Sequence, residues 1–382
     1  MRVLFTSNPG LGHVHPMVPL AQALAGRGHE VRWAVAPEAC PRTETAGFES
    51  FPVGLGGAER RAEFDRCLAE ASSLPPDRRP EHMFPAFFGQ ACTPPMLADL
   101  LPVVDRWPPA LIVNDASDLA APLVAQLRGV PHVTHGFGAL LPAHRIAAAA
   151  EVVAPLWRAH GLEPRPYAGS YDHPYLDIYP PSMRFGSYDH VPHVQPLRPV
   201  PFNAADADPV EPMVVGTRPL VYLTFGTVFN DPGLFSAAMA AAGRLDVDVL
   251  VTVGPAGDPA ALEAVPANVR VERYVPQNAV LPHCAVVVSH AGSGTFLASL
   301  GFGVPQLCLP QGADQFINAG QGAAAGAALT LAPAEASADA IAAALGRLLD
   351  EPAFAGAARR IGEEIAGMPG PDEVAAALES RV

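Results

Sequence analysis

The sequence contains no lysine, so all 24 of its basic residues are arginines, against 38 acidic residues. This absence excludes a P-loop, which needs a phosphate-binding lysine, and it excludes Schiff-base chemistry. A phosphate bound by this chain must be held by backbone N–H groups, hydroxyls, histidine or arginine. The net charge of −14 also argues against nucleic acid or an anionic membrane surface as a partner, because both repel an acidic protein.

Cysteine is scarce as well. The five cysteines are scattered through 382 residues without C-x-x-C spacing, which excludes a disulfide framework and a zinc site and predicts reduced thiols. The apolar run at residues 3–5 is too short for a signal peptide, so we expect a cytoplasmic protein. The uncharged stretch at residues 274–313 is interrupted by proline, glycine and histidine, which predicts a buried strand–helix–strand core and not a membrane span.

The first half of the chain alternates apolar strands with segments of helical periodicity. Pro16 is suited to the first position of a helix that follows a glycine-rich loop at residues 8–15. The pattern is a strand–loop–helix–strand unit that begins a doubly wound parallel sheet. Strands are predicted at residues 2–7, 31–36, 110–114 and 130–134, and a further helix around residues 118–127.

The second half repeats this pattern after a proline-rich stretch. Strands are predicted at residues 220–225, 249–253, 269–274, 286–289 and 306–309, and helices at 339–349 and 373–378. The predicted fold class is therefore α/β, with two Rossmann-like domains and a cleft between them. The predicted parts are a first domain at 1–200, a linker at 201–218, a second domain at 219–360, and a helical segment at 361–382 that packs back on the first domain.

The strongest local signal is the sequence His-Ala-Gly-Ser-Gly-Thr at residues 290–295, where a buried strand leads into a helix. Free N–H groups and the positive end of the helix dipole favour an anion at such a turn. His290, Gly292, Ser293, Gly294 and Thr295 are therefore candidates for binding a diphosphate. The alternative is an ordinary helix N-cap formed by Ser293 without a ligand.

A second signal is Gly-Leu-Gly-His at residues 10–13, directly after the first strand. It departs from a dinucleotide fingerprint because His15 stands where the third glycine belongs. His13 lies at the carboxyl edge of the sheet, where ligands bind, and a helix N-terminus favours the neutral imidazole that a general base needs. Asp115 follows another strand at the same edge and is the candidate carboxylate partner, whereas Asp118 is predicted to cap a helix. The alternative for His13 is a hydrogen bond within its loop.

Further polar residues follow the strand at 306–309. Gln311, Asp314 and Gln315 offer the carboxylate and amides that bind sugar hydroxyls. The alternative for Asp314 is a structural role in a turn or as a helix cap.

Two D-x-D pairs, Asp206/Asp208 and Asp246/Asp248, are candidates for binding a metal ion, and we interpret both as structural. The histidine pairs at 13/15 and 132/135 lack a third metal ligand.

Aromatic and methionine side chains gather in two irregular segments, residues 60–96 and 137–188. Such side chains on segments that interrupt an α/β pattern suit an apolar binding pocket. Phe84, Phe88 and Phe137 are the candidate residues for contacting an acceptor, together with Gly12 beside His13.

Three stretches of the chain resemble motifs of one family, the family 1 glycosyltransferases of the GT-B fold, and especially the bacterial enzymes that decorate antibiotics. They are Gly10-Leu11-Gly12-His13 with Pro16, Thr224-Phe225-Gly226-Thr227, and the long run from Arg273-Tyr274-Val275-Pro276-Gln277 through residues 290–295 and 303–305 to residues 311–315. The chain departs from the family at Ala291, where a glycine often follows the histidine.

The resemblance implies a role for each matching residue. His13 would deprotonate the acceptor hydroxyl, with Asp115 behind it. On the donor side, Thr224, Gly226 and Thr227 would form the first nucleotide loop, and Tyr274 and Val275 would lie near the nucleobase. His290 and Gly292 to Thr295 would bind the diphosphate, and Asp314 and Gln315 the sugar. Gln277 and Gln311 belong to the same donor motif and are further donor-binding candidates.

The function implied is an inverting glycosyltransferase that needs no metal or resident cofactor. It would move a sugar from a dTDP- or UDP-sugar, with dTDP-deoxysugars favoured, to a hydroxyl of a small apolar natural product, with C- and N-transfer as open alternatives. A homodimer is compatible with the sequence.

Three rival functions are a nicotinamide-dependent oxidoreductase, a non-catalytic helper of a partner transferase, and a sugar-nucleotide epimerase. Glu30 argues against the oxidoreductase, because it precedes the second strand instead of following it.

Overall fold

The computed structural model describes residues 1–75, 78–202, 218–225, 232–254, 257–262 and 265–380. The chain divides into two compact units. Unit 1 comprises Met1–Ile178, Gly186–Leu197 and Pro369–Val382, and unit 2 comprises Tyr179–Phe185 and Arg198–Met368. Residues 203–217 of the predicted linker lie outside the described residues.

Unit 1 is built on a seven-stranded sheet with the order β3-β2-β1-β4-β5-β6-β7. All of its strand pairs are parallel. The strands are β1 (Arg2–Thr6), β2 (Glu30–Val35), β3 (Glu49–Pro52), β4 (Leu111–Asp115), β5 (His132–His135), β6 (Tyr175–Asp177) and β7 (Val194–Pro196). The strand order reverses between β1 and β4, which makes the ends of these two strands the switch point where ligands bind in doubly wound sheets.

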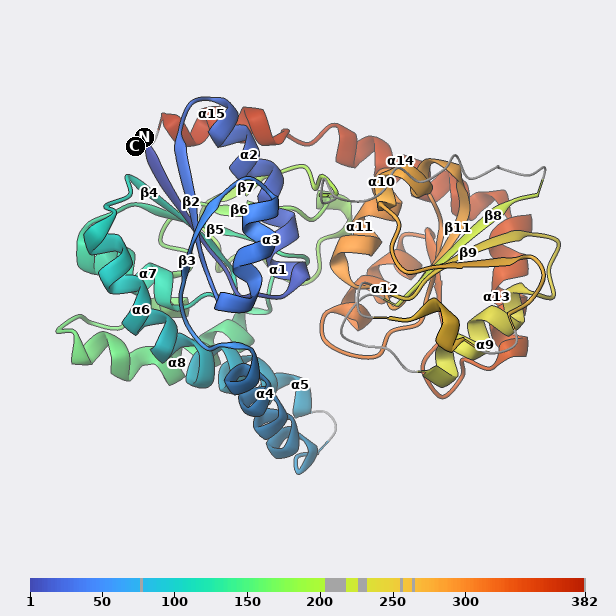
Figure 1. Cartoon of the computed structure of the whole chain (residues 1–382), viewed down its shortest axis with the longest axis horizontal. Coiled ribbons are helices and arrows are strands. Elements are labelled where there is room, and N and C mark those ends of the chain that lie inside the picture. The colour runs from blue at the N-terminus through green and yellow to red at the C-terminus, as the bar shows by residue number, and fades with distance from the viewer. Residues whose placement is uncertain (76–77, 203–217, 226–231, 255–256, 263–264, 381–382) are drawn as a thin grey trace. The chain divides into compact units, whose positions relative to one another are not determined.

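Helices cover both faces of this sheet, because right-handed crossovers that run in opposite directions along a sheet place their helices on opposite faces. The α-helices of unit 1 are α1 (Leu11–Val14), α2 (Val18–Gly26), α3 (Cys40–Thr45), α4 (Gly57–Ser72), α5 (Arg79–Met83), α6 (Thr93–Arg106), α7 (Ala120–Arg128), α8 (Ala143–Ala159) and α15 (Pro371–Glu379). The C-terminal helix α15, red in Figure 1, lies against the blue α2. Arg27 and His29 both contact the carboxylate of Glu379 there.

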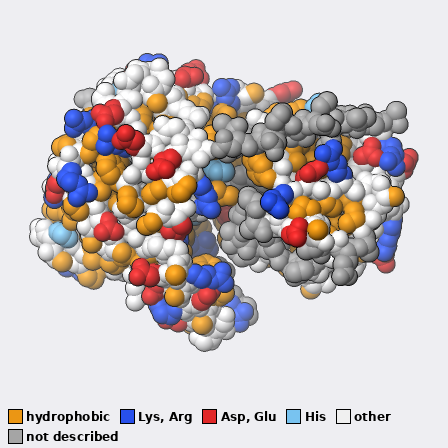
Figure 2. Space-filling view, viewed as in Figure 1, with side chains coloured by type: hydrophobic (Ala, Val, Ile, Leu, Met, Phe, Trp, Pro, Cys, Tyr) orange, Lys and Arg blue, Asp and Glu red, His pale blue; other side chains and the backbone are white. Residues whose placement is uncertain are grey.

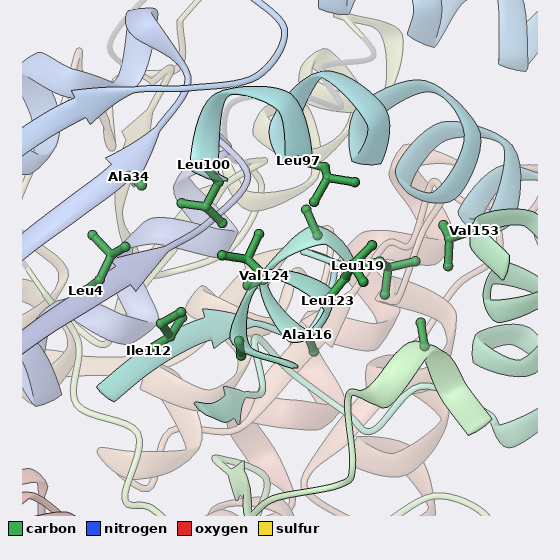
Figure 3. Close-up of a cluster of buried hydrophobic side chains, with 14 of the residues drawn as sticks. Leu4, Ala34, Leu97, Leu100, Ile112, Ala116, Leu119, Leu123, Val124 and Val153 are labelled. Carbon is green, nitrogen blue, oxygen red and sulfur yellow. The ribbon is translucent and has the colours of Figure 1, made fainter. Parts of the chain in front are cut away.

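The core of unit 1 lies between the sheet and helices α6 and α7 (Figure 3). Leu4 of β1 and Ile112 of β4 are fully buried and face Leu97 and Leu100 of α6 and Leu123 of α7. Burial of each such side chain contributes about 1.5–3 kcal/mol. This packing holds the carboxyl ends of β1 and β4 side by side.

A nine-residue π-helical segment, Phe84–Cys92, connects α5 to α6 and packs against α8. It buries Phe84 and Phe87 and leaves Phe88 partly exposed. Because π-helical turns are rare and often occur at functional sites, this segment marks one wall of a candidate pocket.

Unit 2 is built on a six-stranded parallel sheet with the order β10-β9-β8-β11-β12-β13. The strands are β8 (Leu220–Thr224), β9 (Asp248–Thr252), β10 (Val269–Glu272), β11 (Cys284–Ser289), β12 (Gln306–Cys308) and β13 (Ala328–Thr330). The helices are α9 (Pro232–Ala242), α10 (Gln277–Val280), α11 (Ser293–Gly301), α12 (Gln315–Ala324), α13 (Ala338–Asp350) and α14 (Pro352–Ala366).

Alternate residues of the unit 2 strands face two separate cores, as the pleat of a β-strand requires. Val221 and Leu223 of β8 belong to the cluster with α9 and α13. Leu220 and Tyr222 belong to the cluster on the other face, which includes Ala298 of α11. Both faces are therefore covered, as expected for a parallel sheet.

The predicted fold class of two parallel α/β domains is confirmed. Strands predicted at residues 269–274 and 286–289 are observed at Val269–Glu272 and Cys284–Ser289. All five cysteines are free. Among the described residues, no helix is long and apolar enough to cross a membrane.

The predicted start of the first helix is wrong. Helix α1 begins at Leu11, with Gly10 as its N-cap, and Pro16 lies in the 3₁₀ turn that joins α1 to α2. Proline is compatible with that turn because the N–H group that proline lacks would have no hydrogen-bond partner there. His13 is therefore inside a short helix and not in a loop.

Gly362 of α14 makes a close contact on which the packing of α11 depends. A Cβ at Gly362 would lie 2.8 Å from the carbonyl oxygen of Leu300, whereas a Cβ at Gly346 of α13 would meet nothing within 4 Å. We expect Gly362→Ala to lower the free energy of unfolding by about 1–3 kcal/mol through overpacking. Gly346→Ala should raise it by up to ~1 kcal/mol, because alanine favours a helix. Urea unfolding of both variants checks this, and equal effects would contradict the observed close contact.

Candidate active site

His13 is held at the carboxyl edge of the unit 1 sheet by the short helix α1. Its backbone N–H donates to the carbonyl oxygen of Gly10 at 2.9 Å. A Cβ at position 10 would lie 3.0 Å from His13 Cδ2, so glycine at the N-cap leaves room for the imidazole ring. The ring therefore takes one position directly after β1.

The imidazole of His13 is paired with the carboxylate of Asp115 at the end of β4. Its Nδ1 lies 3.2 Å from Asp115 Oδ2 and 3.1 Å from Ser117 Oγ. A hydrogen on Nδ1 is donated to this acceptor pair, so Nε2 carries the lone pair. Among the described residues Nε2 has no partner, and 18% of the side chain is exposed. His13 is thus arranged to accept a proton from a bound molecule.

Asp115 is fully buried and surrounded by donors. It accepts hydrogen bonds from the N–H of Asn8 at 2.9 Å, the N–H of Ser117 at 2.6 Å and the hydroxyl of Ser117 at 2.8 Å. Burial opposes the charged form, but His13 and the two N–H groups outweigh it and hold the pKa of Asp115 below its usual value. The carboxylate is therefore ionised at neutral pH and stabilises a proton on His13.

Asp118 has a different environment from Asp115, although both are fully buried. Its Oδ1 accepts from the N–H groups of Ala120 and Ala121, and its Oδ2 accepts from the hydroxyl of Thr6 at 2.5 Å. The predicted capping of α7 by Asp118 is thus observed. Burial raises the pKa of Asp118 to about 6, and the charge of Asp115 adds to this effect.

Two of the predicted acceptor residues contact the His13 ring. The ring centroid of Phe137 lies 4.6 Å from that of His13, and the centroid of Phe88 lies 5.6 Å away. Phe84 contacts Phe88 and is itself buried in the core. A Cβ at Gly12 would meet nothing within 4 Å, so this side of α1 is open.

A pocket that is partly open to solvent lies next to the residues that surround His13. It shares Phe88, Asn8 and Ser117 with the surroundings of His13. Its lining comprises Ser7, Asn8, Pro9, Ala36, Val53, Gly54, Leu55, Arg60, Phe88, Cys92, Thr93, Met96, Ser117, Asp118 and Leu119. Most of this lining is apolar, as in small-molecule sites.

In unit 2, the first N–H groups of helix α11 have no acceptor among the described residues. Gly292 is the N-cap and has no side chain to cap the helix, and the N–H of Phe296 donates to the Gly292 carbonyl oxygen at 2.9 Å. The N–H groups of Ser293, Gly294 and Thr295 precede that bond and remain available to an anion. Ala291 adopts a φ of 63°, a conformation that glycine enters at lower cost.

His290 lies directly against this turn. A Cβ at position 292 would lie 2.5 Å from His290 Nε2, so only glycine fits beside the ring. Burial lowers the pKa of His290, and its buried Nδ1 has no partner among the described residues. A neutral imidazole with an unused nitrogen is therefore available to a ligand at the turn.

The carboxylate of Asp314 is fixed beside the start of α11. Its Oδ2 accepts from the hydroxyl of Ser293 at 2.5 Å and from Nδ2 of Asn318 at 3.2 Å. Tyr179 in turn donates to Asn318 Oδ1 at 3.0 Å. Asp314 does not cap α12 with its side chain, and its Oδ1 has no partner among the described residues, so it is available to a ligand.

Sequence reasoning missed Asn318 and Tyr179, and in unit 1 it missed Asn8 and Ser117. Asn318 could have been found from its place one helical turn after Asp314. Tyr179 comes from the first half of the chain yet belongs to unit 2, and no local pattern reveals such a contact.

The other residues predicted to bind the sugar nucleotide differ in their contacts and exposure. Gln315 Oε1 accepts from the N–H groups of Gln311 at 2.7 Å and Gly312 at 3.0 Å, and its Nε2 is free among the described residues. Gln277 donates to the hydroxyl of Thr295 at 2.8 Å. The Tyr274 side chain is 42% exposed.

Val275 is buried and Thr224 ends β8, whereas Gly226 and Thr227 lie outside the described residues. The D-x-D pair Asp246/Asp248 contacts Arg218, as expected of a structural pair, and Asp206/Asp208 lies outside the described residues.

Comparison with known proteins finds relatives along the whole chain. The family model for the C-terminal domain of erythromycin biosynthesis protein CIII-like proteins matches residues 236–380. The chain is 34% identical to the elloramycin glycosyltransferase of Streptomyces olivaceus, over 100% of this chain and 97% of that protein. It is 35% identical to the L-demethylnoviosyl transferase of Streptomyces niveus, over 99% of this chain and 97% of that protein.

Solved structures give the same result. The spinosyn rhamnosyltransferase in complex with thymidine diphosphate is 30% identical, with a TM-score of 0.85 over 99% of this chain and 100% of that chain. The same enzyme in complex with the spinosyn aglycone also has a TM-score of 0.85, at 29% identity and the same coverage.

Asp118→Asn should change how stability depends on pH. The pKa of Asp118 is about 6 in the folded protein and near 4 in the unfolded chain. Between about pH 4 and pH 6 the folded protein therefore keeps a proton on Asp118 that the unfolded chain has lost. Stability is therefore lost as the pH rises through that window. The free energy of unfolding of the wild type, minus that of the variant, should fall by about 3 kcal/mol between pH 4 and pH 7.

Urea unfolding at several pH values measures this difference. The same difference in the free energy of unfolding should change in the opposite direction for Asp115→Asn. The pKa of Asp115 is lowered in the folded protein, so its ionised form stabilises the fold above about pH 4, and this stability is lost as the pH falls through the folded pKa. A difference for Asp118→Asn that stays flat with pH would contradict the environment described for this carboxyl.

Proposed function

The chain belongs to the family 1 glycosyltransferases of the natural-product type, which have the GT-B fold, and from this premise we propose its reaction. The enzyme transfers a sugar from a dTDP-sugar to a hydroxyl of a natural-product aglycone, inverting the anomeric carbon and using no metal. It thereby acts in the biosynthesis of an antibiotic or a similar compound. The observation that carries this proposal is the His13–Asp115 pair with its free Nε2 beside an apolar pocket.

The reaction on the acceptor side follows from that geometry. His13 Nε2 takes the proton of the acceptor hydroxyl as its oxygen bonds to the anomeric carbon, and the ionised Asp115 stabilises the imidazolium that forms. General base catalysis of this kind contributes about 10²–10⁴-fold. A single displacement by one base without a covalent intermediate inverts the anomeric carbon, as in other glycosyl transfers through an oxocarbenium-like transition state.

On the donor side, the bond from the anomeric carbon to the diphosphate breaks and negative charge grows on the leaving oxygen. The N–H groups of Ser293 to Thr295, with the Thr295 hydroxyl and His290, are suited to stabilise that charge. Asp314 Oδ1 and Gln315 Nε2 are suited to bind sugar hydroxyls. These neutral donors supply the stabilisation that a metal ion gives in other transferases.

The identity of the donor nucleotide is supported by the relatives. The spinosyn rhamnosyltransferase binds thymidine diphosphate, and the glycosyltransferase VinC was solved in complex with dTDP. The rival oxidoreductase function is not supported, since Glu30 lies at the amino end of β2 and contacts Arg2, Arg32 and Trp107. The complete His13 and α11 sites argue against a non-catalytic helper.

His13→Ala should reduce transfer by at least about 10²-fold, because the proton acceptor is lost. The affinity for dTDP should be unchanged, since the diphosphate-binding groups belong to unit 2. His144→Ala, at an exposed histidine of α8 that pairs with Glu81, is the matched control and should keep full turnover. Transfer to a polyhydroxylated aromatic aglycone is measured together with dTDP binding. Turnover near the wild-type rate in His13→Ala would remove His13 from the base role.

The donor can be identified by thermal unfolding with dTDP, UDP and NAD in parallel. A nucleotide at about 100 times its Kd adds roughly 2.7 kcal/mol, which raises Tm by several degrees for a domain of this size. We expect dTDP to give the largest rise and NAD to give none. A rise with UDP alone would replace the donor, and a rise with NAD alone would overturn the proposed reaction.

A further inference from the structure

Arg60 differs from the other arginines of α4. Arg61 pairs with Asp65, and Arg66 pairs with Glu63 and Glu70. Figure 2 shows blue and red groups side by side on the projection at the bottom of the view, which Figure 1 identifies as α4 and α5. Arg60 has no carboxylate partner among the described residues. It lines the pocket beside His13 instead.

The guanidinium of Arg60 is held in place on one side. Its Nη1 donates to Asn8 Oδ1 at 2.9 Å and to Cys92 Sγ at 3.2 Å. Its plane lies over the Phe87 ring, 4.7 Å from the centroid, a contact that suits a guanidinium. The remaining N–H groups, on Nε and Nη2, have no acceptor among the described residues. A positioned cation with unused donors is expected to bind an anion.

Asn8 connects this cation to the catalytic pair. Its backbone N–H donates to Asp115 Oδ2 at 2.9 Å, and its side-chain Nδ2 donates to Ser117 Oγ at 2.8 Å. Ser117 Oγ in turn lies 3.1 Å from His13 Nδ1. The positions of Arg60 and His13 are therefore fixed by one hydrogen-bond network, and a molecule that contacts both would be held in one orientation.

One carboxyl side chain also lines the pocket, and it forms no ion pair with Arg60 among the described residues. Asp118 is the acidic residue in the lining, and its oxygens are used by Thr6 and by the first N–H groups of α7. The walls are otherwise mainly apolar, with Phe88, Met96 and Leu119 among them. An occupant that fits is an apolar molecule with one acidic oxygen.

We propose that Arg60 binds an acidic oxygen of the acceptor, a carboxylate or an ionised phenol, and so determines which aglycone is used and which hydroxyl reaches His13. This inference rests on the proposed function, since it concerns the acceptor of that reaction. The anion could instead come from the diphosphate of the donor, and the experiment separates the two sources.

The test compares two probes that differ by one charge, a hydroxyanthraquinone carboxylic acid and its methyl ester, by fluorescence titration at pH 7.5. The wild type should bind the acid about tenfold to a hundredfold more tightly than the ester, as expected of a charge-assisted hydrogen bond. Arg60→Met should bring this ratio to about one while keeping the affinity for the ester. Arg61→Met, on the same helix with an exposed side chain, should leave the ratio unchanged.

Three results would overturn the inference: equal binding of acid and ester by the wild type, binding of neither, or an acid preference that survives in Arg60→Met. A loss of dTDP affinity in Arg60→Met, with the acid preference kept, would assign the anion to the donor. Transfer to the two probes is measured separately. If the ratio depends on Arg60 but no sugar is transferred to either probe or to any other acceptor, the proposed function fails and the anion site remains.

Discussion

The ionised carboxylate of Asp115 is fully buried, and such a charge is costly unless donors surround it. Here the donors come from three places: His13 in α1, Asn8 after β1, and Ser117 after β4. Losing any one of these donors would leave the Asp115 carboxylate less well satisfied. This one carboxylate therefore fixes the loops after both β1 and β4. The open nitrogen of His13 and the pocket beside it depend on this arrangement. Asp118, three residues away, has a pKa raised to about 6 by burial and by the charge of Asp115.

Sheet topology explains why both sites lie where they do. In unit 1 the strand order reverses between β1 and β4, and in unit 2 the corresponding strands are β8 and β11. Residues that follow these strands meet at one edge, although more than 100 residues separate His13 from Asp115 along the chain. Unit 2 uses the same rule with β11 and β12, whose ends supply His290 and Asp314. A parallel sheet thus converts distant sequence positions into one site.

This rule also sets how much could be predicted. The strands, the two-domain class, the His13–Asp115 pair and the meeting of Ser293 with Asp314 follow from motifs at strand ends, which the sequence displays. The predicted start of the first helix at Pro16 was wrong, because α1 begins at Leu11 with Gly10 as its N-cap. Asn8, Arg60 and Tyr179 could not be predicted, because each acts through a contact between elements with no shared local pattern. Tyr179 is the clearest case, as its segment leaves unit 1 to pack in unit 2.

The lack of lysine has a different consequence in each unit. The residues suited to the diphosphate in unit 2 are neutral: backbone N–H groups, the Thr295 hydroxyl and a histidine whose pKa is lowered by burial. Neutral donors bind a diphosphate through dipoles and release it without separating a salt bridge, which favours turnover. In unit 1, by contrast, Arg60 has no carboxylate partner among the described residues and lines a mainly apolar pocket. Its unused donors favour an acceptor that carries the opposite charge. Selection of the acceptor would then depend on charge as well as on shape.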